Sequence, residues 1–123
     1  MNVLMFFLIA FIVGLFGAGL GATITLDLLI SLEYQFHRES WESDGKPYGL
    51  AWKPPEGERE FFHDFGKFRL GTLSWKWFFS TPDWMQDDPK ALRLIFLNRV
   101  FSSIWFAGWL SLVAIILVDK SSA

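Results

Sequence analysis

Two long uncharged runs constrain this chain more than any other feature of its sequence. Residues 3–26 and 100–118 contain no Asp, Glu, Lys or Arg. A helix rises about 1.5 Å per residue and the hydrocarbon core of a bilayer is about 30 Å thick, so about 20 apolar residues span it. Both runs meet that requirement, and nearly all charged residues lie between them. The sequence therefore predicts an all-α membrane protein with two transmembrane helices.

The predicted organisation has four parts. Residues 1–32 form the first transmembrane helix, 33–88 a polar and aromatic connecting region with short amphipathic or interfacial helices, 89–118 the second transmembrane helix, and 119–123 a tail. We expect the first span to be retained rather than cleaved as a signal peptide, because no basic segment precedes it. It is also longer than the 7–15 residues typical of a signal-peptide core.

The distribution of basic residues predicts how the chain sits in its membrane. Every Lys and Arg except Lys120 lies between the two uncharged runs. Loops rich in Lys and Arg stay on the cytoplasmic side of a membrane. We therefore expect a two-pass protein of the bacterial inner membrane, with the connecting region in the cytoplasm and both termini in the periplasm.

Small side chains recur at helical spacing in both predicted spans. Without bulk at Cβ two membrane helices approach closely, and dispersion contacts hold them together where the hydrophobic effect does not. The partner is the other span, another subunit or a second copy, and the alternative is that glycine is simply common in membrane helices. The predicted helix-packing positions are Gly14, Gly17, Ala18, Gly21, Ala22, Ser103, Ala107 and Ser111.

Aromatic residues make up 19% of the chain and gather in two places. In the second span, Trp105 and Trp109 are expected to pack against protein or against a bound lipid or pigment, with plain lipid contact as the alternative. In the connecting region, aromatic side chains between residues 61 and 79 fall near one helical face. This pattern predicts an amphipathic helix in the headgroup plane, whose interfacial residues are Phe61, Phe65, Phe68, Trp75 and Phe79.

Several polar residues are interpreted as structural. Asp27 follows the first uncharged run, and we interpret it as marking the headgroup boundary rather than as a functional intramembrane acid. Asp88 before Pro89 predicts the start of the second long helix, because Asp caps free amides and proline tolerates the first helical position. By the same pattern, Thr81 before Pro82 predicts the cap of a preceding short helix.

No catalytic, cofactor-binding or metal site is predicted. The two histidines, His37 and His63, lie outside both spans, so neither is placed as an axial haem ligand in the bilayer. Nucleotide-binding and hydrolase motifs are absent from the sequence, and so is cysteine, which excludes disulfides and iron–sulfur clusters. With a net charge of −2, the chain lacks the excess of positive charge that is typical of proteins that bind nucleic acid.

One segment resembles a known family. Residues 37–47 read H-x-E-x-W-E-x-x-G-x-P, and they are followed by an amphipathic stretch, the Asp88-Pro89 pair and a closing hydrophobic helix. This layout is similar to that of small two-span bacterial inner-membrane proteins such as universal stress protein B. The similarity covers most of the chain as topology but only these residues as sequence, and the Pro- and Trp-rich centre at 52–84 departs from it. The resemblance implies a two-pass inner-membrane protein and carries no established chemistry.

These features predict a non-catalytic accessory subunit that stabilises a larger integral membrane protein complex through its small-residue faces and aromatic contacts. We expect the host to be an energy-converting complex, respiratory or photosynthetic, and the other partners to be membrane lipids. The alternative is a self-standing stress-response protein that acts as a homo-oligomer through Gly14, Ala18 and Ala22. The least favoured interpretation is an enzyme or cofactor carrier that uses His37 or His63.

Overall fold

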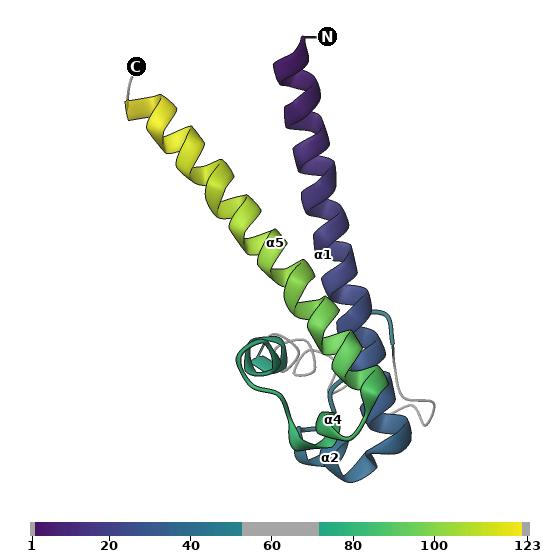
Figure 1. Ribbon diagram of the computed structural model, residues 1–123. Coiled ribbons are helices and arrows are strands. Elements are labelled where there is room, and N and C mark those ends of the chain that lie inside the picture. Colours follow the sequence, from purple (N-terminus) through teal and green to yellow (C-terminus); the bar gives the residue numbers. More distant parts are fainter. Residues whose placement is uncertain (1, 53–71, 122–123) are drawn as a thin grey trace.

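The computed structural model of the protein describes residues 2–52 and 72–121. In chain order these residues form α1 (Val3–Phe36), α2 (Arg38–Ser43), a helical segment at residues 72–79, α4 (Asp83–Gln86) and α5 (Pro89–Ser121) (Figure 1). No strand occurs within these two ranges. The predicted all-α fold with two long helices is confirmed, and α1 continues to Phe36, past the boundary expected at residue 32.

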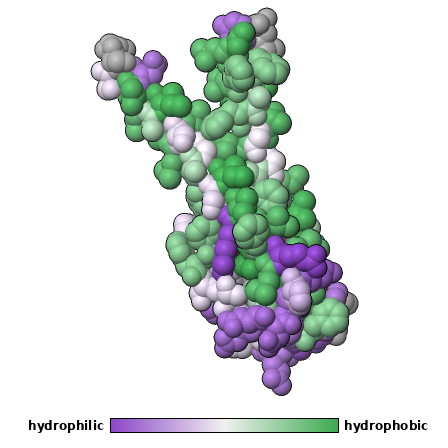
Figure 2. Space-filling view, viewed as in Figure 1, coloured by the Kyte–Doolittle hydropathy of each residue, from purple (hydrophilic) through white to green (hydrophobic). Residues whose placement is uncertain are grey.

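The two long helices have the surface of membrane-spanning helices. Only 11% of the most apolar window of α1, and 6% of that of α5, is buried inside the protein. A core helix of a soluble protein is instead mostly buried, because a large exposed apolar surface in water promotes association. Figure 2 shows apolar residues covering the outer surface of both helices, with the polar residues gathered at the opposite end from the termini. The chain is therefore an all-α protein with two transmembrane helices.

The two spans form a fork that closes at the connecting region. α1 and α5 pack against each other along the halves nearest that region and diverge toward the N- and C-termini (Figure 1). They are in tight contact at Gly108, where an added Cβ would overlap the side chain of Leu15. An added Cβ at Gly19 would likewise meet the ring of Trp105. The absence of side chains at these two glycines thus sets how closely the helices approach.

Asn98 joins the two helices by hydrogen bonds at the start of their contact. Its side chain is buried, and Nδ2 donates to the carbonyl oxygen of Ala22 at 2.8 Å and to Oγ1 of Thr25 at 3.1 Å. Thr25 Oγ1 in turn donates to a backbone carbonyl of its own helix. Interhelical hydrogen bonds of this kind contribute about 0.6–2 kcal/mol in membrane proteins. Asn98 therefore defines the register of the pair near the membrane boundary.

The helical segment at residues 72–79 lies across the long helices (Figure 1). Arg99, the last charge before the second uncharged run, donates to the carbonyl oxygen of Trp77 at 2.9 Å and to Oγ1 of Thr81 at 2.8 Å. Trp75 and Phe79 stack at 5.8 Å, are largely exposed, and lie on the side where Trp75 meets Phe106 of α5. The position of Trp75 and Phe79 in the headgroup plane stays a prediction, and Phe61, Phe65 and Phe68 lie outside the described residues.

A compact head forms at the closed end of the fork. We use the name head for residues 27–52 and 72–99, where the end of α1, α2, the 72–79 segment, α4 and the start of α5 meet. Its interior is apolar and draws on every one of these elements. Its most deeply buried apolar side chains include Leu29, Ile30, Trp41, Trp77, Met85, Ala91 and Ile95.

Two short-range expectations about the head have different outcomes. The Asp88 cap is confirmed, because its Oδ1 accepts from the amides of Lys90 at 3.1 Å and Ala91 at 3.3 Å. The Thr81 cap is wrong, because α4 begins after Pro82 without a side-chain cap. The Thr81 hydroxyl instead accepts a hydrogen bond from Arg99, which lies 18 residues away. A long-range partner therefore replaces the local one.

Asp27 does more than mark the boundary of the apolar run. Its carboxylate accepts hydrogen bonds from the backbone amides of Leu50 and Ala51, both at 2.8 Å, and of Trp52 at 3.3 Å. Successive amides that converge on one carboxylate hold the chain against the side of α1. Asp27 therefore anchors residues 50–52, which follow α2, to the side of α1.

Replacing Asp27 with asparagine is expected to loosen this segment. Asparagine offers one acceptor oxygen, and its amide group would face backbone N–H donors, so about 2 kcal/mol of stability should be lost. Hydrogen exchange at Leu50, Ala51 and Trp52 should become faster in D27N and stay unchanged in D87N, an exposed control on the head. Equal exchange in D27N and wild type would contradict the anchoring role.

Candidate functional site

The most unusual group in the head is a buried carboxyl. Glu33 lies about two helical turns beyond the uncharged run of α1, outside the membrane-spanning segment, and its side chain is 0% exposed. Neither of its oxygens has a hydrogen bond of standard geometry within the described residues. An unpaired buried charge is strongly disfavoured. The position of Glu33 therefore requires either a bound proton or a charged partner.

Three side chains surround Glu33 and determine its ionisation. Burial raises the pKa of Glu33 from 4.5 to about 9, and the neighbouring Asp44 raises it further toward that value. Lys76 and the indole N–H of Trp84 act in the opposite direction and lower the pKa of Glu33. Lys76 Nζ also lies 3.3 Å from Asp44 Oδ1 in an ion pair. At neutral pH Glu33 is therefore protonated, beside an acid that is paired with a lysine.

A cleft of about 570 Å³ adjoins this group. Asp44, Lys76 and Trp84 belong both to the surroundings of Glu33 and to the wall of the cleft, so they stand between the buried carboxyl and the surface. The rest of the wall is mostly polar and includes two further acids. It consists of Glu39, Ser40, Ser43, Pro82 and Asp83.

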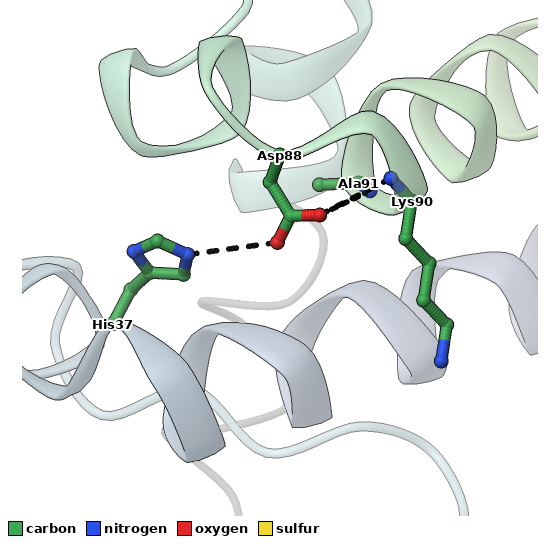
Figure 3. Close-up of polar contacts among 4 residues, drawn as sticks. All are labelled: His37, Asp88, Lys90 and Ala91. Carbon is green, nitrogen blue, oxygen red and sulfur yellow. Dashed lines mark hydrogen bonds and ion pairs between the residues drawn. The ribbon is translucent and has the colours of Figure 1, made fainter.

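His37 links the end of α1 to the start of α5. Its Nε2 lies 3.6 Å from Asp88 Oδ2, while the other oxygen of Asp88 caps α5 (Figure 3). The imidazole ring also lies 4.9 Å from the ring of Trp84. His37 therefore has a bridging position in the head, next to the aromatic side chain that touches Glu33.

The described residues provide no metal site. Among residues 2–52 and 72–121, no three His, Asp or Glu side chains come together as ligands. His63 lies outside these ranges. The indole N–H groups of Trp77 and Trp84 are buried without a hydrogen-bond partner in the same part of the chain. The group in these ranges whose surroundings favour a bound proton is Glu33.

A second hollow lies beside the membrane-spanning part of the fork. This groove has a volume of about 490 Å³ and lies between α1, α5 and the 72–79 segment. The ring of Phe16 meets Trp105 edge-on at 6.2 Å and Trp109 at 6.1 Å, so both tryptophans pack against protein. A bound lipid or pigment beside them stays a prediction. The groove is lined by Phe16, Gly19, Leu20, Ala22, Thr23, Ser74, Ser102, Trp105 and Phe106.

The predicted helix-packing residues divide into two groups. Ala18 is buried, and Gly21 and Ala22 contact α5 through Phe101 and Asn98. The others are exposed, and contact through them with another chain stays a prediction. These exposed positions are Gly14, Gly17, Ser103, Ala107 and Ser111.

Sequence reasoning did not find the residues of α5 that face α1. The buried residues of α5 are Ala91, Ile95, Asn98, Ser102 and Gly108. They lie on a face adjacent to the predicted row of Ser103, Ala107 and Ser111. A polar Asn one residue before Arg99 was a signal that this face is protected from lipid.

Comparisons with protein-family models, curated proteins and solved structures find no match to this chain. The resemblance to universal stress protein B therefore stays a prediction.

Proposed function

We propose that this protein is a non-catalytic accessory subunit of a larger integral membrane complex. The observation that supports the proposal is the open half of the fork (Figure 1). Beyond Leu15 and Gly108 the two helices diverge, and their side chains toward the termini are almost all exposed. Membrane helices associate through close packing rather than through exclusion from water. The diverging halves offer such packing surfaces to helices of another protein.

Gly14 and Gly17 strengthen this proposal. An added Cβ at either position would meet no atom within 4 Å. Glycine is therefore not required at these positions by the fold of the chain itself. Glycine lowers the stability of a helix, and at these positions no contact within the chain requires it. A helix of another protein that packs closely against α1 would explain why glycine is present. On the other long helix, Ser103, Ala107 and Ser111 are exposed in the same manner.

The proposal includes the membrane and the orientation. The head carries the basic residues of the chain's described part except Lys120, and both termini lie at the other end of the fork. The rule that basic segments stay inside supports a cytoplasmic head and periplasmic termini in a bacterial inner membrane. We further propose that the host is an energy-converting complex, respiratory or photosynthetic.

Affinity purification from gently solubilised native membranes tests this function. The wild-type chain is expected to bring down integral membrane subunits, and G14L is expected to lose most of them, because leucine fills the space that a partner helix would occupy. The fold itself should tolerate G14L, since nothing in the chain lies near that position. V13L serves as the matched control, because it changes an exposed apolar side chain without filling a glycine gap.

Two results would contradict the proposal. One is recovery of the chain without any other membrane protein. The other is recovery of the same subunits, in the same amounts, with wild type, G14L and V13L. A crosslinked homodimer as the sole product would support the self-standing homo-oligomer instead.

A further inference from the structure

We propose that Glu33 and Asp44 form a proton-binding carboxyl pair that keeps the head closed while one proton is held between them. The pair arises where the chain reverses direction after α1. Glu33 lies in the last turns of α1, and α2 ends at a turn where Gly45 has φ 92° and Lys46 has φ 55°. This reversal returns Asp44 to the side of Glu33.

Burial determines how many charges the pair can hold. Glu33 is fully buried, and the side chain of Asp44 is only 13% exposed. Two neighbouring carboxylates in such surroundings do not both ionise, because each disfavours the charge on the other. One proton removes the repulsion and allows the Glu33 hydroxyl to donate to Asp44. When the pair holds one proton, the hydrogen bond between Glu33 and Asp44 favours the closed head. When the pair holds no proton, the repulsion between the two carboxylates opposes it.

Lys76 lies at the outer side of the pair. Its ammonium group, itself largely exposed, pairs with Asp44 at 3.3 Å. The proton of the pair is placed on the deeper Glu33. The raised pKa of Glu33 agrees with this assignment.

Each element packed around the pair contributes a defined group. α4 contributes the Trp84 indole, and the 72–79 segment contributes Lys76. On α1 itself His37 follows one turn later, and it is already engaged by Asp88 at the start of α5. These contacts explain why loss of the proton acts on the whole head. A second negative charge would separate α1 from the turn after α2, because the Glu33 and Asp44 carboxylates would repel each other.

Infrared spectroscopy of the purified full-length chain in lipid nanodiscs tests the pair directly. A protonated carboxylic acid has a C=O stretching band that a carboxylate lacks, and exposed acids are ionised at neutral pH. We expect this band in the wild type at neutral pH and expect its loss in E33Q. E42Q, which changes an exposed glutamate of α2, should retain it.

Two further variants should shift the titration of this band in opposite directions. D44N should lower the pH at which the band disappears, because Asp44 raises the pKa of Glu33. K76Q should raise that pH, because Lys76 lowers the same pKa. These shifts also test the pair if E33Q does not fold. Absence of the band from the wild type at neutral pH, its persistence in E33Q, or shifts of the same sign in D44N and K76Q would overturn the proposal.

Discussion

E33Q is expected to be more stable than the wild type at neutral and alkaline pH, and equally stable below about pH 4.5. The pKa of Glu33 is raised from 4.5 to about 9 in the folded chain. The unfolded chain therefore releases this proton near pH 4.5 while the folded chain keeps it. The stability that Glu33 contributes is fully present below pH 4.5 and is lost as pH rises toward 9.

The size of this effect follows from the shift. One pKa unit corresponds to about 1.4 kcal/mol, so the loss reaches about 3 kcal/mol at about pH 7 and about 6 kcal/mol at about pH 9. Glutamine has nearly the same shape as protonated glutamate and does not titrate. It should therefore preserve the packing of the acid form at every pH.

Reversible unfolding in mixed detergent micelles, followed at several pH values, measures this difference. Other acids in the head also titrate, so the informative quantity is the free energy of unfolding of E33Q minus that of the wild type. This difference should grow with pH from about 5 to about 9. The difference between E42Q and the wild type should stay constant, and a constant difference for E33Q would disprove the prediction.

Replacing Gly108 with leucine is expected to force the two spans apart. A Cβ at this position already overlaps Leu15 of α1, and leucine adds three more carbon atoms at the same point. Overpacking by a few carbons costs about 1–3 kcal/mol in a well-packed site. We expect a loss at the upper end of this range, about 3 kcal/mol, because Leu15 is buried and the added leucine atoms must displace its side chain from between the helices.

Unfolding of G108L in detergent micelles measures this loss, and G17L provides a control with the same change of side chain. Gly17 lies in open space, so G17L should be close to the wild type in the isolated chain. Shortening Leu15 to alanine in the G108L background should recover part of the loss, because it removes the overlapping atoms. Equal stability of G108L and G17L would show that the helices do not meet at Gly108.

Much of the architecture could be predicted because its causes are local. The length and apolarity of residues 3–26 and 100–118 suffice for two spans, since lipid requires every backbone group to be bonded within its own helix. The Asp88 cap also depends on neighbours a few residues away. Trp75 and Phe79 stack on one side of the 72–79 segment because helical periodicity is a property of the chain alone, while their place in the headgroup plane stays a prediction.

The roles of the polar residues could not be predicted, because each depends on a partner far along the chain. Thr81 has the sequence context of a helix cap, yet its hydroxyl accepts from Arg99. Asp27 stands at the end of an apolar run, yet three amides more than 20 residues away converge on it. In each case the sequence shows a group that needs a partner but does not show which partner is near.

By itself, then, the sequence determined the helical class, the two spans and the start of the second long helix, since each follows from apolar length or from contacts within one helical turn. Only the tertiary structure decided which face of each span is buried and that Glu33 is enclosed beside Asp44. The physical reason is that burial and charge pairing depend on distances in space. Those distances appear only when the two spans pack against each other and the connecting region folds at the closed end of the fork.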